Sequence, residues 1–190
     1  MKKILFLVMS ALAFMGNVNA QKTVDFKLQA DGSFVNSSDG KNFVVIPFDG
    51  KTKDELYSET LVAVTKLYNS PKDVISKVEG EVISINGISQ NCVVLKAMMG
   101  IKVAFSIQYV LQFQFKEGKL RVDAPVISRF FSDTAADISP FSGWLEAQSV
   151  FKKGKANPKK QGTIDDFNNT LNGLINNIIS NMGNKSEDNW

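Results

Sequence analysis

The stretch from Val103 to Lys116, VAFSIQYVLQFQFK, decides the fold because its apolar and polar side chains alternate over fourteen positions. The apolar set is Val103, Phe105, Ile107, Tyr109, Leu111, Phe113 and Phe115. The intervening set is Ala104, Ser106, Gln108, Gln112 and Gln114, with Val110 as the exception. Successive side chains of a strand point to opposite faces. The stretch therefore predicts a strand with one buried face and one glutamine-rich face in water.

The neighbouring segments predict further strands around it. Glu117-Gly118 is a turn that leads into a second alternating stretch, Lys119 to Val126. Asn86-Gly87 is a strong two-residue hairpin signal, because both residue types tolerate positive φ. Asn42 to Phe48 is apolar and ends at Asp49-Gly50, which predicts an earlier strand. Together these segments indicate a twisted antiparallel sheet with helices on one face.

Two helices are predicted to cover that face. Thr52 and Glu55 have the spacing of a capping box, and the helix after them ends before Pro71. A last helix is expected over about residues 163–182, with Thr163 and Asp166 as a second capping box. Its apolar stripe is Ile164, Phe167, Leu171, Leu174, Ile175, Ile178 and Met182. Opposite that stripe lie Asn168, Asn169, Asn172, Asn176 and Asn177.

The order of these elements predicts one α+β domain over residues 42–183. Residues 21–41 are polar and rich in turn-forming residues, so we expect a flexible N-terminal segment with a short strand at Val24 to Leu28. The aromatic-rich segment 130–151 is expected to wrap the sheet edge, and residues 184–190 to form a tail. A chain of this length suits a single core.

The N-terminus predicts export. Lys2 and Lys3 precede the unbroken apolar run Ile4 to Phe14, and small residues precede a cleavage point between Ala20 and Gln21. This is the pattern of a secretory signal peptide. The apolar run has about half of the roughly 20 residues that a membrane-spanning helix needs. We therefore expect a periplasmic or extracellular protein without a transmembrane segment in its mature chain.

Composition excludes several function classes. Removal of residues 1–20 leaves 20 basic and 19 acidic side chains, and this balance gives no general attraction for nucleic acid. The chain has no histidine and one cysteine, Cys92, which excludes Ser-His-Asp and Cys-His catalysis and histidine-containing zinc sites. No catalytic residue, cofactor or metal ligand is predicted. The lysine-rich stretch 152–160 is interpreted as a solvated linker, with phosphate or lipid headgroups as the alternative contact.

Several short motifs resemble a family of secreted proteins from Gram-negative gut anaerobes. They are Asp54-Glu55-Leu56-Tyr57, Ser70 to Ile75, Glu79 to Ile83 and Phe115 to Arg121, and the similarity covers about residues 43–130. That family is a domain of unknown function with a TBP-like fold. The resemblance implies a curved antiparallel sheet with helices on one face, and it brings no catalytic residues.

Three functions remain in competition. The first is an exported, non-catalytic binding module for an envelope protein, glycan or lipid, suggested by the absence of a reactive constellation. The alternative is a carrier of an apolar small molecule held between the sheet and the last helix, with Met98, Met99 and Met182 as candidate lining residues. The third is a hydrolase without histidine, because two catalytic carboxylates can come from distant positions.

One surface modification is also predicted. Asp133-Thr134-Ala135 fits the short acceptor sequence at which exported proteins of such bacteria are glycosylated, if the resemblance places the source correctly. Thr134 is then a candidate O-glycan acceptor in an exposed loop. The alternative is an ordinary turn in which the Asp133 side chain accepts a hydrogen bond from a backbone amide.

The amphipathic assignment of the last helix gives a first prediction. Leu171→Asp and Ile175→Asp each place a carboxylate on the apolar stripe, and each is expected to lower the free energy of unfolding by roughly 3 kcal/mol or more. Asn172→Asp on the other side is expected to be nearly silent. Chemical denaturation measures all three. Equal losses at the three sites would remove the assignment.

Overall fold

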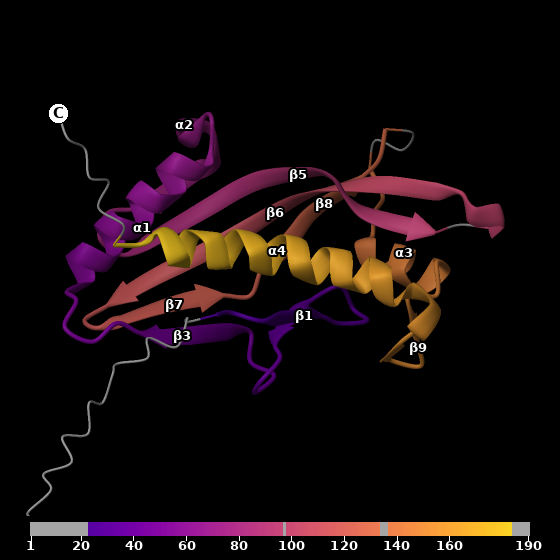
Figure 1. Cartoon of the computed structure of the whole chain (residues 1–190), viewed down its shortest axis with the longest axis horizontal. Helices are drawn as coiled ribbons and strands as arrows, with labels where there is room; N and C mark the ends of the chain where they lie inside the picture. Colours follow the sequence, from indigo (N-terminus) through magenta and orange to yellow (C-terminus); the bar gives the residue numbers. More distant parts are fainter. Residues whose placement is uncertain (1–22, 97, 134–136, 184–190) are drawn as a thin grey trace, which may run out of the picture.

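The long strand predicted around residue 109 is the centre of the sheet. A computed structural model describes residues 23–96, 98–133 and 137–183 (Figure 1). Strand β6 (Lys102–Lys116) pairs on one side with β5 (Val82–Lys96) and on the other with β7 (Lys119–Asp123) and β8 (Val126–Phe131). With β3 (Phe43–Pro47) and β4 (Ile75–Val78) they form a six-stranded antiparallel sheet of order β3-β7-β6-β5-β4, with β8 beside β6. The alternation is confirmed, because every second side chain from Phe105 to Phe115 is buried.

Two long helices lie on the same face of this sheet (Figure 1). Helix α1 (Lys53–Leu67) begins at the predicted capping box, in which Thr52 and Glu55 each satisfy the other's backbone N–H. Helix α4 (Gln161–Asn181) packs on β5, on α1 and on the N-terminal strand β1. Leu171 and Ile175, the two apolar positions of the first prediction, are both fully buried. The α+β class with helices over one face of an antiparallel sheet is therefore confirmed.

The remaining elements are short. They are β1 (Phe26–Leu28), β2 (Phe34–Asn36), α2 (Pro71–Val74), the 3-10 turn η1 (Met98–Gly100), α3 (Phe141–Ala147), β9 (Phe151–Lys152), β10 (Lys155–Ala156) and η2 (Pro158–Lys160). Among the described residues, no helix has the length and hydrophobicity needed to cross a membrane.

The predicted hairpin at Asn86-Gly87 is wrong. Strand β5 runs straight through both residues, and its hairpin with β6 turns instead at η1. Gly87 faces Tyr109 across the strand pair, and a Cβ at Gly87 would lie 2.5 Å from the Tyr109 hydroxyl oxygen. The glycine thus makes room for an aromatic ring, which is the other reason for a glycine inside a strand. The Tyr109 hydroxyl reaches Tyr68 at the end of α1, at an oxygen–oxygen distance of 2.9 Å.

The expectation of a flexible N-terminal segment is also wrong for the residues that the structure describes. From residue 23 onward the segment forms the β1–β2 hairpin, and Val24, Phe26, Leu28 and Phe34 are buried in the core. The short strand expected at Val24 to Leu28 is present, and the polar loops around it are its turns. The domain therefore begins well before residue 42.

Helix α4 holds β1 through a ladder of asparagines. The N–H groups of Leu28, Phe26 and Val24 donate to the Oδ1 atoms of Asn168, Asn172 and Asn176 at 2.9, 2.8 and 2.7 Å. The Nδ2 atoms of Asn172 and Asn176 donate back to the carbonyls of Phe26 and Val24. Four helix residues rise about 6 Å and two strand residues about 6.7 Å. Side-chain amides at every fourth helix position therefore match every second strand residue, and they act as a neighbouring strand would.

The predicted capping box at the start of α4 is wrong for a related reason. The helix begins at Gln161 without a side-chain cap, and Thr163 and Asp166 both turn to strand β5. The Thr163 hydroxyl donates to the Val94 carbonyl at 2.9 Å, and the Asp166 carboxylate accepts from the Val94 N–H at 2.9 Å. Strand β4 pairs only with residues 82–85 of β5. The helix thus satisfies the strand edge where β4 no longer does.

The aromatic-rich segment 130–151 forms a cluster rather than a single regular element. Phe130 on β8 stacks on Phe105 of β6, with ring centroids 4.9 Å apart. Trp144 on α3 packs edge-on against Phe130 at 4.6 Å. Phe167 on α4 closes the cluster at 5.7 Å from Phe130. This cluster fixes the first half of α4 against the sheet.

The asparagine ladder reverses the expected outcome at Asn172. Asn172→Asp removes the Nδ2 donor to Phe26 and sets a carboxylate against that carbonyl and near the Asp25 carboxylate. We now expect a loss of about 1–2 kcal/mol in the free energy of unfolding. Asn169→Asp, an exposed neighbour on the same helix, is the matched control and is expected to change stability little. Urea denaturation measures both, and equal effects would contradict the ladder.

Candidate functional site

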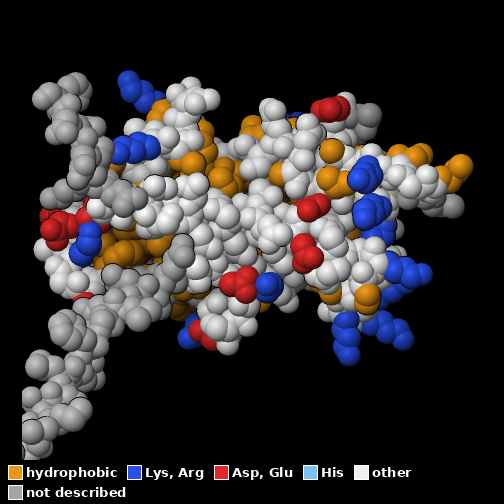
Figure 2. Space-filling view, in the orientation of Figure 1, with side chains coloured by type: hydrophobic (Ala, Val, Ile, Leu, Met, Phe, Trp, Pro, Cys, Tyr) orange, Lys and Arg blue, Asp and Glu red, His pale blue; other side chains and the backbone are white. Residues whose placement is uncertain are grey.

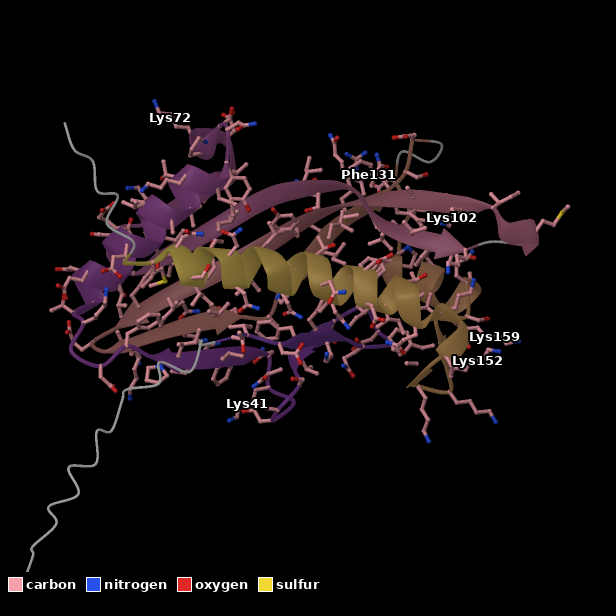
Figure 3. All side chains as sticks on the ribbon, viewed as in Figure 1. Lys41, Lys72, Lys102, Phe131, Lys152 and Lys159 are labelled. Atoms are coloured by element: carbon pink, nitrogen blue, oxygen red, sulfur yellow. The ribbon has the colours of Figure 1, made fainter. Side chains whose placement is uncertain are left out.

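Seven lysines gather at one end of the molecule, which we call the lysine end. They come from the facing ends of β5 and β6, from the β9–β10 hairpin and from η2, just before α4 begins. They are Lys96, Lys102, Lys152, Lys153, Lys155, Lys159 and Lys160. Figure 2 shows basic side chains concentrated there, and Figure 3 labels Lys102, Lys152 and Lys159 at this end. The linker expected over residues 152–160 is therefore a folded hairpin followed by a 3-10 turn.

Four of these lysines form two cross-strand pairs of like charge. Lys96 is the direct cross-strand partner of Lys102 at the end of the β5–β6 hairpin. Lys152 is the direct cross-strand partner of Lys155 in the β9–β10 hairpin. Like charges directly opposite each other destabilise a strand pair. An anion bound beside either pair would relieve the repulsion within that pair.

The described part of the chain places few negative charges beside these lysines. Ion pairs are formed by lysines elsewhere, such as Lys51 with Glu59 and Lys53 with Glu81. No ion pair among the described residues includes any lysine of the lysine end. The Lys160 ammonium donates to the Lys96 carbonyl at 3.2 Å and so joins η2 to the β5–β6 hairpin. The positive charges of this end are left to solvent or to a ligand.

A cleft opens between four of these lysines and the start of α4. It has a volume of about 380 Å³ and is lined by Val94, Lys96, Lys102, Lys159, Lys160, Gly162, Thr163 and Asp166. The α4 N-terminus has no side-chain cap, and the helix dipole favours negative charge at that point. One carboxylate, Asp166, also lines the cleft, where it accepts the Val94 N–H. The site is therefore a predominantly positive depression suited to an anion.

An apolar tip projects from the same end. Met99 is 97% exposed and Ile101 is 60% exposed, at the turn between β5 and β6. Met99 has φ +60°, a left-handed conformation that glycine or asparagine adopts more easily. In Figure 2 the hydrophobic tip extends beyond the basic side chains. The chain thus presents a large apolar side chain to solvent at a turn, where small polar residues are usual.

The outer face of the sheet is the second candidate surface. It carries the predicted glutamines, and a cleft of about 410 Å³ lies there beside Phe43, Gln114 and Arg121. Its polar groups already bind one another: Gln114 and Arg121 both donate to Asp123 at 2.7 Å. The Arg121 guanidinium also stacks 4.1 Å from the centre of the Phe43 ring. Gln114, Arg121 and Asp123 are thus paired with one another, whereas no lysine of the lysine end has an ion-pair partner among the described residues.

Several residues singled out in the sequence have their place fixed by the structure. Met99 lies almost completely in solvent and not between the sheet and the last helix, so its proposed part in an apolar carrier site is wrong. Met182 is buried, and its sulfur accepts the Thr60 hydroxyl at 3.4 Å. The cleavage residues Ala20 and Gln21 and the candidate acceptor Thr134 lie outside the described residues, and those predictions stand as predictions.

Two ionisable side chains, Cys92 and Tyr68, have pKa values raised by burial. Burial raises the pKa of the half-buried Cys92 thiol, which disfavours the nucleophilic thiolate. Burial and the hydrogen bond with Tyr109 raise the pKa of the Tyr68 hydroxyl far above its usual value. The described residues contain no group of three or more Cys, Asp or Glu side chains placed to hold a metal ion.

Sequence reasoning found five of the seven lysines of the lysine end. It singled out residues 152–160 and missed Lys96 and Lys102, because these are far away in the chain. A local signal was present. The segment Lys96 to Lys102, KAMMGIK, is an apolar turn with a lysine on each side, and apolar side chains at a turn indicate a surface role more often than a core role.

The geometry of the sheet and helices matches that of known proteins. A TBP-like protein from Parabacteroides distasonis has a similar structure, with a TM-score of 0.52 and 13% sequence identity over 75% of this chain and 91% of the other. A DUF4468 family protein from Bacteroides ovatus gives a TM-score of 0.49 and 12% identity over 76% of this chain and 86% of the other. No curated protein matches the sequence. The similarity to the Parabacteroides distasonis protein shows that the fold is TBP-like.

The family follows from the sequence profile. Residues 43–128 match the family described as "Domain of unknown function (DUF4468) with TBP-like fold". The chain therefore carries a DUF4468 domain, as the resemblance of residues 43–130 predicted. The match contains the β5–β6 hairpin with Lys96 and Lys102. It does not extend to α3, the β9–β10 hairpin or α4, so the lysine end is shared between the family domain and the C-terminal segment.

Proposed function

We propose that this protein is an exported, non-catalytic binding module that docks on an anionic component of the cell envelope through its lysine end. The observation that carries this proposal is a cleft lined by four lysines, namely the cross-strand pair Lys96–Lys102 together with Lys159 and Lys160. The N-terminal pattern of residues 1–20 supports export. The raised pKa of Cys92 and the absence of histidine support a binding role over a catalytic one.

The energetic argument rests on repulsion within the free protein. Each Lys–Lys pair holds two ammonium groups together without a carboxylate partner among the described residues, and the opening of the cleft faces the solvent. A multivalent anion bound there would interact with several ammonium groups at once. The folded hairpins fix the backbone positions from which these lysines extend, so no backbone segment has to become ordered on binding. A modest net charge of the whole chain does not oppose this, because steering depends on the local field.

The two ends of β6 allow a test of whether an anion binds at the lysine end or responds only to the total charge of the protein. Lys96 and Lys102 form the cross-strand pair at one end, and Lys116 and Lys119 form an equivalent pair at the other. Lys96→Gln with Lys102→Gln is expected to weaken binding of a heparin hexasaccharide, a soluble polyanion, about fivefold. This assumes about 0.5 kcal/mol for each ammonium group. Isothermal titration calorimetry at low ionic strength measures the dissociation constants.

The control removes the same charge elsewhere. Lys116→Gln with Lys119→Gln is expected to leave the dissociation constant nearly unchanged, because Glu117 and Glu81 already make that end mixed in charge. The difference between the two double variants should shrink at high ionic strength, where charges are screened. Equal weakening in both variants would mean that charge alone is sensed, and it would contradict a site at the lysine end.

A further inference from the structure

The lysine end combines positive charge with exposed apolar side chains in one direction. Met99 and Ile101 lie at the outermost point of the β5–β6 hairpin, and Lys96 and Lys102 form the strand pair directly behind them. The β9–β10 hairpin and η2 add their lysines at the same end of the molecule (Figures 2 and 3). A soluble anion would contact the lysines, but its binding would not account for the exposed apolar side chains of Met99 and Ile101.

This arrangement matches a flat surface with an anionic outer layer and an apolar layer below it. We propose that the lysine end binds an anionic lipid bilayer, with Met99 and Ile101 entering the headgroup–acyl boundary and the lysines contacting headgroup phosphates. The inference rests on the proposed function and names its ligand class. The required depth is small, because interfacial segments bury their apolar side about 5–10 Å into that boundary.

The dimensions of the tip favour a bilayer over a protein partner. A stable protein interface needs roughly 800 Å² of complementary surface on each side. Among the side chains that the structure describes, the exposed apolar part of this turn is Met99 and Ile101. A bilayer needs no shape complementarity. Each lysine close to an anionic bilayer strengthens binding roughly fivefold, so a few lysines and a shallow apolar insertion act together.

The conformation of the tip supports the same role. Met99 has a left-handed backbone conformation, which is unfavourable for a residue with a side chain. Its side chain is almost completely exposed, so burial does not offset this unfavourable conformation. Asparagine or glycine would be accommodated there with less strain and better solvation. A methionine offers instead a flexible apolar side chain that adapts to an irregular environment such as the lipid interface.

The experiment separates insertion from charge. The experiment uses protein whose intact mass shows that residues 1–20 have been removed. It is mixed with vesicles of pure phosphatidylcholine, or with vesicles in which about a quarter of the lipid is phosphatidylglycerol, and the vesicles are then sedimented. Met99→Ser with Ile101→Ser is expected to lower partitioning into the anionic vesicles roughly tenfold. The same variant should bind the heparin hexasaccharide as the unmodified protein does. The unmodified protein should also raise the surface pressure of a phosphatidylglycerol monolayer, and the variant should not.

A matched control removes equally exposed apolar side chains elsewhere. Val78 on β4 and Val126 on β8 are 61% and 57% exposed, and Val78→Ser with Val126→Ser should leave vesicle partitioning unchanged. Heparin binding without vesicle binding would overturn the bilayer assignment and leave the proposed function standing, with a soluble or protein-borne anion as the ligand. Absence of both would overturn the two together. Equal partitioning of the tip variant and the unmodified protein would overturn insertion.

Discussion

The pairing of helix α4 with two strand edges is the interaction on which the rest of the structure depends. Asn168, Asn172 and Asn176 supply amides to β1, and Thr163 and Asp166 supply a donor and an acceptor to Val94 on β5. A backbone group left unpaired in a buried place costs about as much as a lost hydrogen bond. The helix meets this requirement at both edges while its apolar stripe fills the core between them.

This role of α4 also places the lysine end. Its first turn is fixed to β5 beside Lys96, and the η2 lysines precede it directly in the chain. The Phe130, Trp144 and Phe167 cluster holds the same half of the helix against β8 and α3. The lysines of distant segments are thus brought together by packing that has its own energetic basis. A rigid scaffold of this kind lets repulsive lysine pairs persist in the folded protein.

Features that depend on neighbours in sequence could be predicted, and those that depend on distant contacts could not. The alternation of β6 and the Thr52–Glu55 capping box are local, and both are present. Gly87 was misinterpreted because its reason is the Tyr109 ring, 22 positions away in the chain. Asn172 was misinterpreted because its partner, Phe26, is 146 positions away. An asparagine on a polar helix side looks solvated unless the strand beside it is known.

The same limit applied to the candidate site. Residues 152–160 were recognisable as basic, but a lysine stretch with glycine and proline is typical of a linker. Its meaning changed when Lys96 and Lys102 proved to lie beside it. The family assignment of residues 43–128 gave the fold and left the function open. The function proposed for this chain therefore comes from side chains of the family domain, Lys96 and Lys102 among them, together with the lysines that the C-terminal segment adds.

Amide hydrogen exchange at β1 tests the central claim, that side chains of α4 act as the missing neighbour of that strand. The N–H groups of Val24, Phe26 and Leu28 have asparagine side chains as their partners. The account predicts that these three amides exchange slowly, with protection close to that of the buried strand β6, and that they open together with α4. Exchange at the rate of an unstructured peptide, with α4 still protected, would contradict it.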